Sequence, residues 1–221
     1  GAALPKLIGR GGEPLIRSGV DVAMRMMGEQ FVTGQTISEA LANSRAMEKK
    51  GFRYSYDMVG EAATTAEDAA RYLKDYEQAI HAIGKASKNR GIYEGPGISI
   101  KLSALHPRYQ RQKLDRVMEE LLPILKKLAL LARSYDIGLN IDAEEMDRLE
   151  LSLDLLEALC FDPELADWNG IGFVVQAYSK RCPFVIDYLI DLARRSRHRL
   201  MIRLVKGAYW DTEIKRAQGD G

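Results

Sequence analysis

Short apolar segments alternate with longer amphipathic ones along most of the chain. Five of the short segments predict strands, at residues 52–59, 97–103, 138–143, 170–177 and 200–205. Between them apolar residues recur at steps of three and four, which predicts helices. The strand starts lie roughly 30 to 45 residues apart, so we expect parallel strands joined by right-handed helical crossovers.

Local signals place the first two helices of this pattern. The segments 36–39 (TISE) and 64–67 (TTAE) both have the spacing of a capping box. Helices should therefore begin there and run to Gly51, a candidate C′ glycine, and to about Ala86.

Further helices are expected after the second, third, fourth and fifth strands. The stripe at residues 117–131 is interrupted by Pro123, which predicts a kink or a break. The next helix should start at the acidic pair Glu144 and Glu145 and end near Cys160. Pro183 suits the first turn of the helix that follows the fourth strand, and residues 207–218 form the last helix.

The residues before the first strand predict a separate helical segment. Residues 1–52 are expected to be helices that lead into the main domain, and residues 53–221 hold the five strand–helix units. Apolar residues recur at helical spacing after Pro14, at Ile16, Val20, Met24 and Met27.

Polar residues on one face of the strands separate two architectures. The strands of an open, doubly wound sheet are buried on both faces and read as continuous apolar runs. Here one parity is polar: Ser55 and Asp57; Ser99, Lys101 and Ser103; Asn140 and Asp142; Gln176; and Arg203. In a barrel that parity faces the lumen and converges at the C-terminal mouth, where barrel enzymes hold their active sites. We therefore expect an α/β fold of the TIM-like (βα)8 barrel class.

Four of these polar residues form the candidate site: Lys101, Asp142, Gln176 and Arg203. A single polar residue near the end of a strand most often only contacts solvent. Four polar residues that lie on the same face of consecutive strands indicate a shared site. Lys101 and Asp142, on neighbouring strands, are placed to pair, which would offset the cost of charge in a partly closed mouth.

Composition and charge argue against several classes of partner and location. The chain has 32 Lys and Arg residues against 31 Asp and Glu residues. It therefore lacks the excess of basic residues that is typical of nucleic-acid-binding proteins. No apolar run reaches the roughly 20 residues of a spanning helix, and residues 1–10 lack the core of a signal peptide. Cys160 and Cys182 lack a metal-type spacing and are expected to be buried thiols in a reducing compartment. We therefore expect a cytoplasmic protein.

Several catalytic classes fit the sequence poorly. His81, His106 and His198 form no His-x-His pair, so metal-dependent hydrolysis is disfavoured. No nucleophile elbow supports Ser-His-Asp catalysis. A Schiff-base lyase or aldolase needs a lysine on a strand, and both Lys101 and Lys206 qualify, so that alternative stays open.

The fifth strand leads into the most informative segment, residues 203–210 (RLVKGAYW). Gly207 permits a tight turn, and the helix start behind it favours an anion. Lys206 adds a cation, and Tyr209 and Trp210 add flat surfaces, so a nucleotide-like cofactor is indicated. The arginine that opens the segment is placed to hydrogen-bond to a flavin ring. An ordinary βα turn is the alternative, and no Gly-x-Gly-x-x-Gly supports a Rossmann site.

Four segments carry a resemblance to a known family: GISIKLSALHPRY, NIDAEEMDRLELSLDLL, GFVVQAYSKRCP and RLVKGAYWD. They closely resemble the proline dehydrogenase domain of the bacterial bifunctional proline utilisation A flavoenzymes, as do GGEPLIR and MGEQFVTG near the start. The resemblance implies a distorted (βα)8 barrel that holds FAD at the C-terminal ends of its strands. It implies oxidation of L-proline to Δ1-pyrroline-5-carboxylate, with electrons passed to a membrane quinone at the inner face of the membrane.

The resemblance also assigns roles to single positions. Lys101 is implied to hold the substrate carboxylate, Asp142 to be the active-site aspartate, and Glu61 to pair with a mobile arginine at the mouth of the closed site. Gln176 is implied to contact the flavin and Arg203 to lie near its N5 atom. The remaining cofactor positions are Ala143, Val205, Lys206, Gly207, Ala208, Tyr209 and Trp210.

More of the barrel is implied to lie outside this sequence. The family's last three strands, the paired arginines that grip the proline carboxylate, and the second enzyme, an aldehyde dehydrogenase, have no counterpart before Gly221. Both ends of the sequence are expected to be the ends of an excerpt. We therefore expect a continuation or a second chain as partner. An inert domain fragment that binds nothing alone is the non-enzyme alternative.

Overall fold

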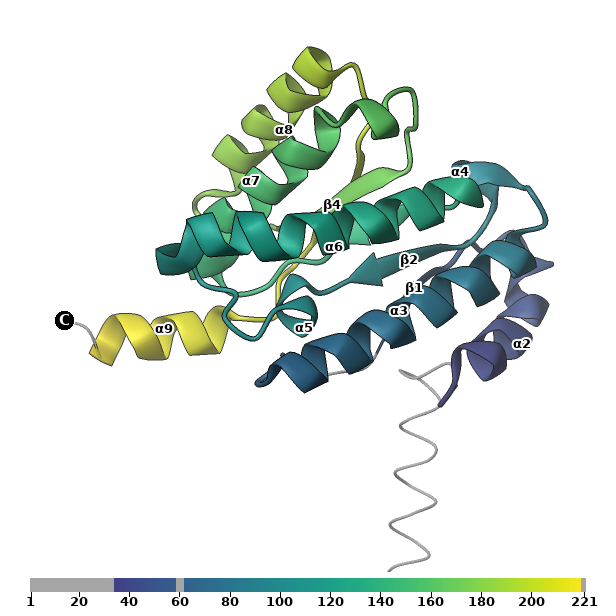
Figure 1. Ribbon diagram of the computed structural model, residues 1–221, viewed down its shortest axis with the longest axis horizontal. Helices are drawn as coiled ribbons and strands as arrows, with labels where there is room; N and C mark the ends of the chain where they lie inside the picture. Colours follow the sequence, from purple (N-terminus) through teal and green to yellow (C-terminus); the bar gives the residue numbers. More distant parts are fainter. Residues whose placement is uncertain (1–33, 59–61, 220–221) are drawn as a thin grey trace, which may run out of the picture. The chain divides into compact units, whose positions relative to one another are not determined.

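The computed structural model describes residues 34–58 and 62–219 (Figure 1). Its five strands form one parallel sheet in the order β1-β2-β3-β4-β5. They are β1 (Ser55–Asp57), β2 (Gly97–Ile100), β3 (Leu139–Ile141), β4 (Ile171–Gln176) and β5 (Met201–Val205). A doubly wound sheet reverses its strand order at a switch point. The strictly sequential order confirms the barrel-type topology.

One hydrogen bond shows how strongly the sheet curls. Arg203 on β5 donates from Nη2 to the Ser99 hydroxyl on β2 at 3.2 Å. Neighbouring strands lie about 4.8 Å apart, so in a flat sheet these two strands would be separated by roughly 14 Å. The polar face is therefore concave, and the fold is a parallel α/β half-barrel.

The other face of the sheet packs against helices and forms the core. Ile98, Ile100, Leu139, Ile141 and Phe173 are all essentially buried. The covering helices are α3 (Ala66–Ser87), α6 (Leu114–Ser134), α7 (Leu149–Cys160) and α8 (Cys182–Ser196) (Figure 1). Cys160 and Cys182 are buried free thiols within this layer.

The outer face of β5 differs from the faces of its neighbours. Ile202 and Leu204 point outward and are 44% and 59% exposed. The helix after this strand, α9 (Trp210–Gly219), extends away from the sheet instead of covering it (Figure 1).

Two compact units make up the chain, Gly1–Phe52 and Arg53–Gly221. The first contains α2 (Ile37–Glu48) with Thr36 as its N-cap, as expected. The Glu39 carboxylate accepts the N–H of Gln35 rather than that of the cap residue. The helix ends at Glu48, and Gly51 follows at φ +94°. The expected helix at Ile16–Met27 lies outside the described residues.

The capping box of α3 lies one residue later than the sequence pattern indicates. Thr65, not Thr64, is the N-cap, and Asp68, not Glu67, closes the box. The Asp68 carboxylate accepts from the Thr64 hydroxyl and from the Thr65 N–H, at 2.8 and 3.1 Å. These bonds lower the pKa of Asp68 to about 2.

Of the kink or break predicted at Pro123, the break is wrong, because α6 continues through it from Leu114 to Ser134. A proline within a helix leaves the carbonyl four residues earlier, here that of Glu119, without its N–H partner. Pro123 and Glu119 are both exposed, so water can satisfy that carbonyl. Pro183 lies in the first turn of α8, as predicted.

Strand 97–103 was expected to be longer than it is. β2 ends at Ile100, and Leu102–Leu105 forms a short helix, α5. All four residues of α5 are buried, which suits a buried turn rather than an alternating strand. Strand 52–59 is likewise reduced to the three residues of β1.

The acidic pair Glu144 and Glu145 does not start a helix, contrary to expectation. A 3₁₀ helix, η2 (Met146–Arg148), follows the pair and leads into α7. The Glu144 carbonyl and carboxylate are held by Gln176 and Ser103, which keeps this segment in a loop. Shorter elements complete the chain: α4 (Gly91–Glu94), η1 (Arg111–Lys113) and η3 (Pro163–Leu165).

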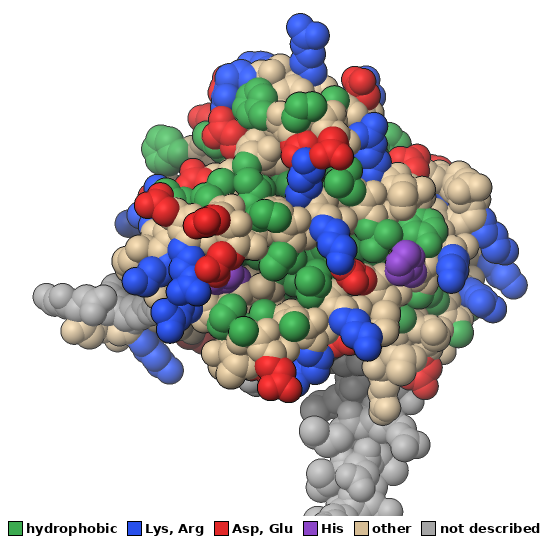
Figure 2. Space-filling model, in the orientation of Figure 1, with side chains coloured by type: hydrophobic (Ala, Val, Ile, Leu, Met, Phe, Trp, Pro, Cys, Tyr) green, Lys and Arg blue, Asp and Glu red, His purple; other side chains and the backbone are tan. Residues whose placement is uncertain are grey.

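Charged side chains of both signs cover the outer helices. On the face in Figure 2, Lys and Arg are interspersed with Asp, Glu and apolar side chains. Within the described residues, every helix is either too short or too polar to span a bilayer.

Candidate active site

The concave face carries the predicted polar residues, and several of them are buried. Ser99, Asn140 and Gln176 are 0%, 8% and 7% exposed. Gly172 on β4 lies against Asn140, where an added Cβ would be 1.7 Å from the Asn140 Oδ1 atom. The Asn140 amide donates to Ser55 on β1 at 3.4 Å. This polar layer lines the half-barrel beneath its C-terminal mouth.

Arg203 and Asp142 form an ion pair at the mouth, with Nη2 and Oδ1 3.3 Å apart. Asp142 directly follows β3, and its Oδ1 also accepts the N–H of Ala143 at 3.0 Å. The Arg203 Nε atom is buried and has no hydrogen-bond partner among the described residues. Arg203 therefore reaches across the concave face with one donor left for another group.

Lys101 does not pair with Asp142, so the expected ion pair is wrong. The Lys101 ammonium lies 3.9 Å from the carboxylate of Asp57 at the end of β1. The buried Tyr76 hydroxyl accepts the Lys101 backbone N–H at 3.0 Å, where β2 ends. The curl of the sheet brings Arg203 on β5 to Asp142 after β3. Lys101 instead pairs with Asp57 on the neighbouring strand β1.

Asp57 lies at the mouth beside Lys101, although the sequence analysis did not include it in the candidate site. Burial raises the pKa of its carboxyl group; the Lys101 charge opposes this shift and the Asp142 charge adds to it. The signal was present in the sequence, because Asp57 has the lumen parity and lies at a strand end. Two carboxylates and two cations therefore alternate at the mouth.

Gln176 joins two loops through both ends of its amide. Its Nε2 donates to the Glu144 carbonyl at 2.8 Å, and its Oε1 accepts the Ala208 N–H at 3.2 Å. The loop after β3 is thereby held to the turn after β5. The sequence could not predict this connection, because both partners of the Gln176 amide are backbone groups.

The turn after β5 requires glycine for two reasons. Gly207 adopts φ +111°, which side chains with a Cβ rarely tolerate. An added Cβ would also lie 2.2 Å from the ring of Tyr178 and 3.1 Å from Gln176 Oε1. Tyr178 donates its N–H to the Lys206 carbonyl at 3.1 Å and meets the Trp210 ring edge-on at 5.9 Å between centroids.

The other predicted cofactor residues surround this turn. Val205 ends β5 opposite Gln176, and its carbonyl accepts the Ala177 N–H at 2.8 Å. Burial raises the pKa of Tyr209 to about 12, and Trp210 is 55% exposed. Glu61 lies outside the described residues.

Glu144 is a second residue that the sequence reasoning did not place in the site. Its carboxylate is 7% exposed and accepts the Ser103 N–H at 3.2 Å. Arg148 lies 3.3 Å away. Burial raises the pKa of Glu144. A second, mostly buried carboxyl group is thus held two residues after Asp142, in the same loop.

The residues at the mouth fit an anionic cofactor with an aromatic ring. The unpartnered Arg203 Nε offers a donor, Lys206 is an exposed cation, and the exposed Trp210 offers a ring face. Across residues 34–58 and 62–219, His, Cys, Asp and Glu side chains form no cluster of three suited to a metal ion.

Sequential parallel strands, a curled sheet and charged residues at the carboxyl ends of the strands define the chain as part of a barrel of the enzyme type. The proline dehydrogenase family model matches residues 40–221. The chain therefore belongs to the proline dehydrogenase family.

Individual relatives agree with this assignment. The chain is 78% identical over 219 residues to the bifunctional protein PutA of Klebsiella aerogenes, covering 99% of this chain and 17% of that protein. It is 27% identical over 185 residues to proline dehydrogenase 1 of Bacillus subtilis, and the match covers 84% of this chain and 53% of that enzyme. The chain thus spans about a sixth of the PutA relative and about half of the smaller enzyme.

Solved structures share the fold. A crystal structure of a point mutant of proline utilization A from Bradyrhizobium japonicum is 52% identical, with a TM-score of 0.82 over 97% of this chain and 22% of that one. The structure of proline utilization A from Bdellovibrio bacteriovorus is 24% identical, with a TM-score of 0.86 over 93% of this chain and 22% of that one. That second likeness supports the fold alone.

Proposed function

We propose that this chain supplies the first five βα units of an FAD-dependent proline dehydrogenase. The enzyme oxidises L-proline to Δ1-pyrroline-5-carboxylate and passes the electrons to a membrane quinone. One observation carries the proposal: the Arg203–Asp142 and Lys101–Asp57 pairs alternate positive and negative charge on one concave face. Such a face complements a zwitterionic amino acid, and the family assignment identifies which one.

The substrate carboxylate is assigned to Lys101. The ammonium is a compact cation at the end of β2, and its contact with Asp57 at 3.9 Å is loose enough for a carboxylate to compete. In this proposal Glu61, together with cations from the rest of the barrel, completes the closed substrate site.

Asp142 is assigned an orienting role. It already accepts hydrogen bonds from Arg203 and from the Ala143 N–H, so its charge is engaged before substrate arrives. Proline must lose a proton from nitrogen and a hydride from carbon. In this role Asp142 aligns the amine, and water takes the proton.

The cofactor is assigned to Arg203, Gln176, Ala143 and the segment 205–210. Bound FAD supplies the acceptor for the hydride. The Arg203 Nε, which has no hydrogen-bond partner among the described residues, supplies a donor toward the ring. The Gly207 turn, packed against the Tyr178 ring, supports the segment that carries Lys206 and Trp210. Gln176 holds the loop and the turn that flank this position.

The remaining barrel is proposed as the partner of the open side. Ile202 and Leu204 are exposed on the outer face of β5, and this strand ends the described sheet. A parallel edge strand with an uncovered apolar face needs a further strand and helix. A cytoplasmic location beside the membrane follows from the quinone acceptor.

An absorption spectrum of the full-length protein tests the proposed function. Flavin bands that bleach when L-proline is added without oxygen are the expected result, and Lys101→Ala should require far more proline for the same bleaching. A colourless protein whose Lys101 or Lys206 is trapped by borohydride with a carbonyl substrate would establish the Schiff-base alternative instead. A colourless protein without trapping would leave the chain without either activity.

A further inference from the structure

The helix α9 is held to the barrel by a carboxylate. Glu213 accepts the Met146 backbone N–H through Oε1 at 3.0 Å, across 67 residues of sequence. Met146 opens η2, whose own N-cap residue, Glu145, makes no side-chain cap. Glu213 thus supplies from another element the cap that this 3₁₀ helix lacks.

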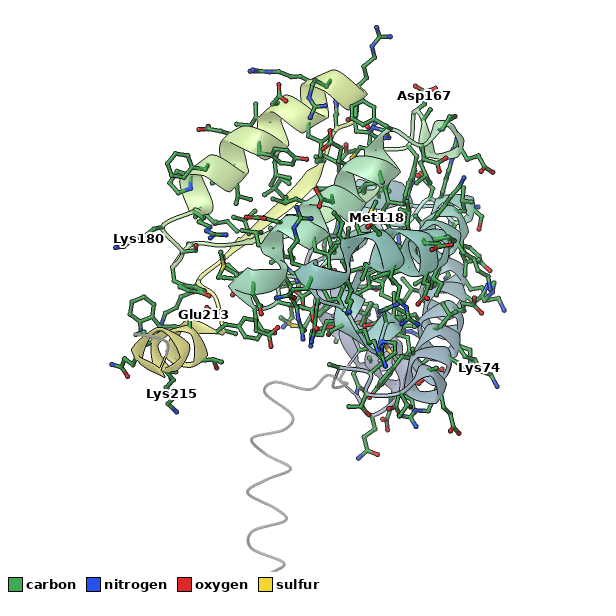
Figure 3. All side chains as sticks on the ribbon, turned by 60° about the vertical axis from the view of Figure 1, so that its left-hand side comes forward. Lys74, Met118, Asp167, Lys180, Glu213 and Lys215 are labelled. Carbon is green, nitrogen blue, oxygen red and sulfur yellow. The ribbon has the colours of Figure 1, made fainter. Side chains whose placement is uncertain are left out.

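Burial within α9 is concentrated at this residue. Of the α9 side chains that the structure describes, Glu213 alone is not exposed; Trp210 and Ile214 are 55% and 37% exposed. In Figure 3 Glu213 lies toward the barrel, while Lys215 points away from it. A helix with so little apolar burial depends on polar contacts for its position.

The Glu213 contact connects two segments of the candidate site. Met146 directly follows the loop 142–145, which begins with Asp142 and Ala143 after β3. Glu213 lies one helical turn after Tyr209, whose carbonyl accepts the Glu213 N–H at 2.9 Å. The proposed cofactor segment and the proposed substrate loop, which Gln176 joins near β5, therefore meet a second time through the Glu213–Met146 hydrogen bond.

We infer that Glu213 is a positioning residue, which holds the cofactor turn after β5 in place against the loop that carries Asp142. The inference rests on the proposed function, because it assigns the residue to the binding of FAD. Glu213 acts through Met146 and need not touch substrate or cofactor. Gln176, which accepts the Ala208 N–H, and Tyr178, in edge contact with Trp210, are further anchors of the same turn.

Three variants of the full-length protein test the inference. Glu213→Ala removes the acceptor, Glu213→Gln keeps an oxygen in its place, and Asp211→Ala removes the neighbouring first-turn carboxylate as a matched control. A bond to a charged acceptor corresponds to roughly tenfold or more in affinity. Glu213→Ala should therefore weaken FAD binding about tenfold and speed hydrogen exchange of the Met146 amide. The KM for proline of the FAD-saturated protein should stay within about twofold.

The pattern across the variants decides the outcome. Glu213→Gln should restore most of the FAD affinity and the Met146 protection, and Asp211→Ala should match wild type. If wild type binds FAD and Glu213→Ala binds it equally well, the positioning role is wrong while the proposed function stands. Equal losses in Glu213→Ala and Asp211→Ala would also overturn it, since a general weakening of α9 would explain both. A wild type that cannot bind FAD would overturn the proposed function and this role together.

Discussion

The Lys101 ammonium lies 3.9 Å from the Asp57 carboxylate, across the β1–β2 pair. Asp57 is thus the counter-ion of the proposed carboxylate-binding lysine. Lys101→Ala should raise the KM for L-proline roughly tenfold to a hundredfold, because it removes a charge-assisted bond of about 1.5–3 kcal/mol. In an Asp57→Ala background the same substitution should cost less, since the lysine has already lost its orienting partner. Steady-state kinetics of the four proteins give the coupling, and additive effects would contradict this pairing.

Arg203 is anchored by Ser99 and Asp142, and its Nε has no partner within the part of the chain that the structure describes. Arg203→Ala should lower FAD occupancy or shift the flavin reduction potential, because it removes the donor assigned to the flavin ring. Ser99→Ala removes one anchor only and should change both quantities less, in the same direction. The flavin-to-protein absorbance ratio and a redox titration measure them. Full occupancy with an unchanged potential in Arg203→Ala would remove Arg203 from the cofactor site.

Asp142→Asn separates a general base from an orienting charge. The amide retains an oxygen for the Arg203 and Ala143 donors, so the loop geometry should persist. For an orienting residue we expect a modest loss, mainly in kcat/KM, and little change in the pH profile. A general base predicts a kcat lower by roughly 10²–10⁴-fold at neutral pH that partly recovers as pH rises. Observing that second profile would transfer the role of base to Asp142.

Gly207→Ala should disturb the cofactor turn more than its backbone angle alone explains. Both Gly207 and Gly51 have positive φ, but an added Cβ meets Tyr178 at 2.2 Å in the first case and nothing within 4 Å in the second. Gly51→Ala should cost about 1–2 kcal/mol, and Gly207→Ala should cost more and also reduce FAD occupancy. Thermal unfolding and flavin content compare the two variants. Equal destabilisation with full occupancy would mean that the Tyr178 ring yields easily.

Glu144→Gln should change how stability depends on pH. Burial raises the pKa of Glu144, so the folded state favours its protonated form. The contribution of Glu144 to the free energy of unfolding of the wild type is fully present below the ordinary glutamate pKa. It is lost as pH rises through the pKa of the folded state. The free energy of unfolding of Glu144→Gln minus that of wild type should therefore increase as pH rises above the ordinary glutamate pKa. Denaturant titrations measure it, with the exposed Glu119→Gln as the matched control. A difference that is constant with pH would contradict the raised pKa.

Much of the fold followed from local patterns in the sequence. The period of the polar positions placed Ser99, Asn140, Gln176 and Arg203 on one face of the sheet, and the structure confirms that face as concave. Periodicity works here because side-chain direction alternates along a strand whatever surrounds it. Some boundaries differ from the local pattern: α5 replaces the end of the second strand, and α6 continues through Pro123.

The cofactor and substrate roles came from the resemblance, not from periodicity. Family membership is established by the match over residues 40–221. The assignments of FAD, quinone and single catalytic roles remain proposals, and Glu61 lies outside the described residues. The sequence could identify these positions because a motif such as RLVKGAYWD is contiguous.

By itself, then, the sequence determined the order of the elements, the polar face and the identity of the charged residues, because each depends on neighbours along the chain. Only the tertiary structure decided the partners. It joins Lys101 to Asp57, Arg203 to Asp142 and Ser99, and Glu213 to Met146. These contacts join different strands and loops, so they depend on how far the sheet curls and on where each loop turns. A pattern with a period of two contains neither quantity.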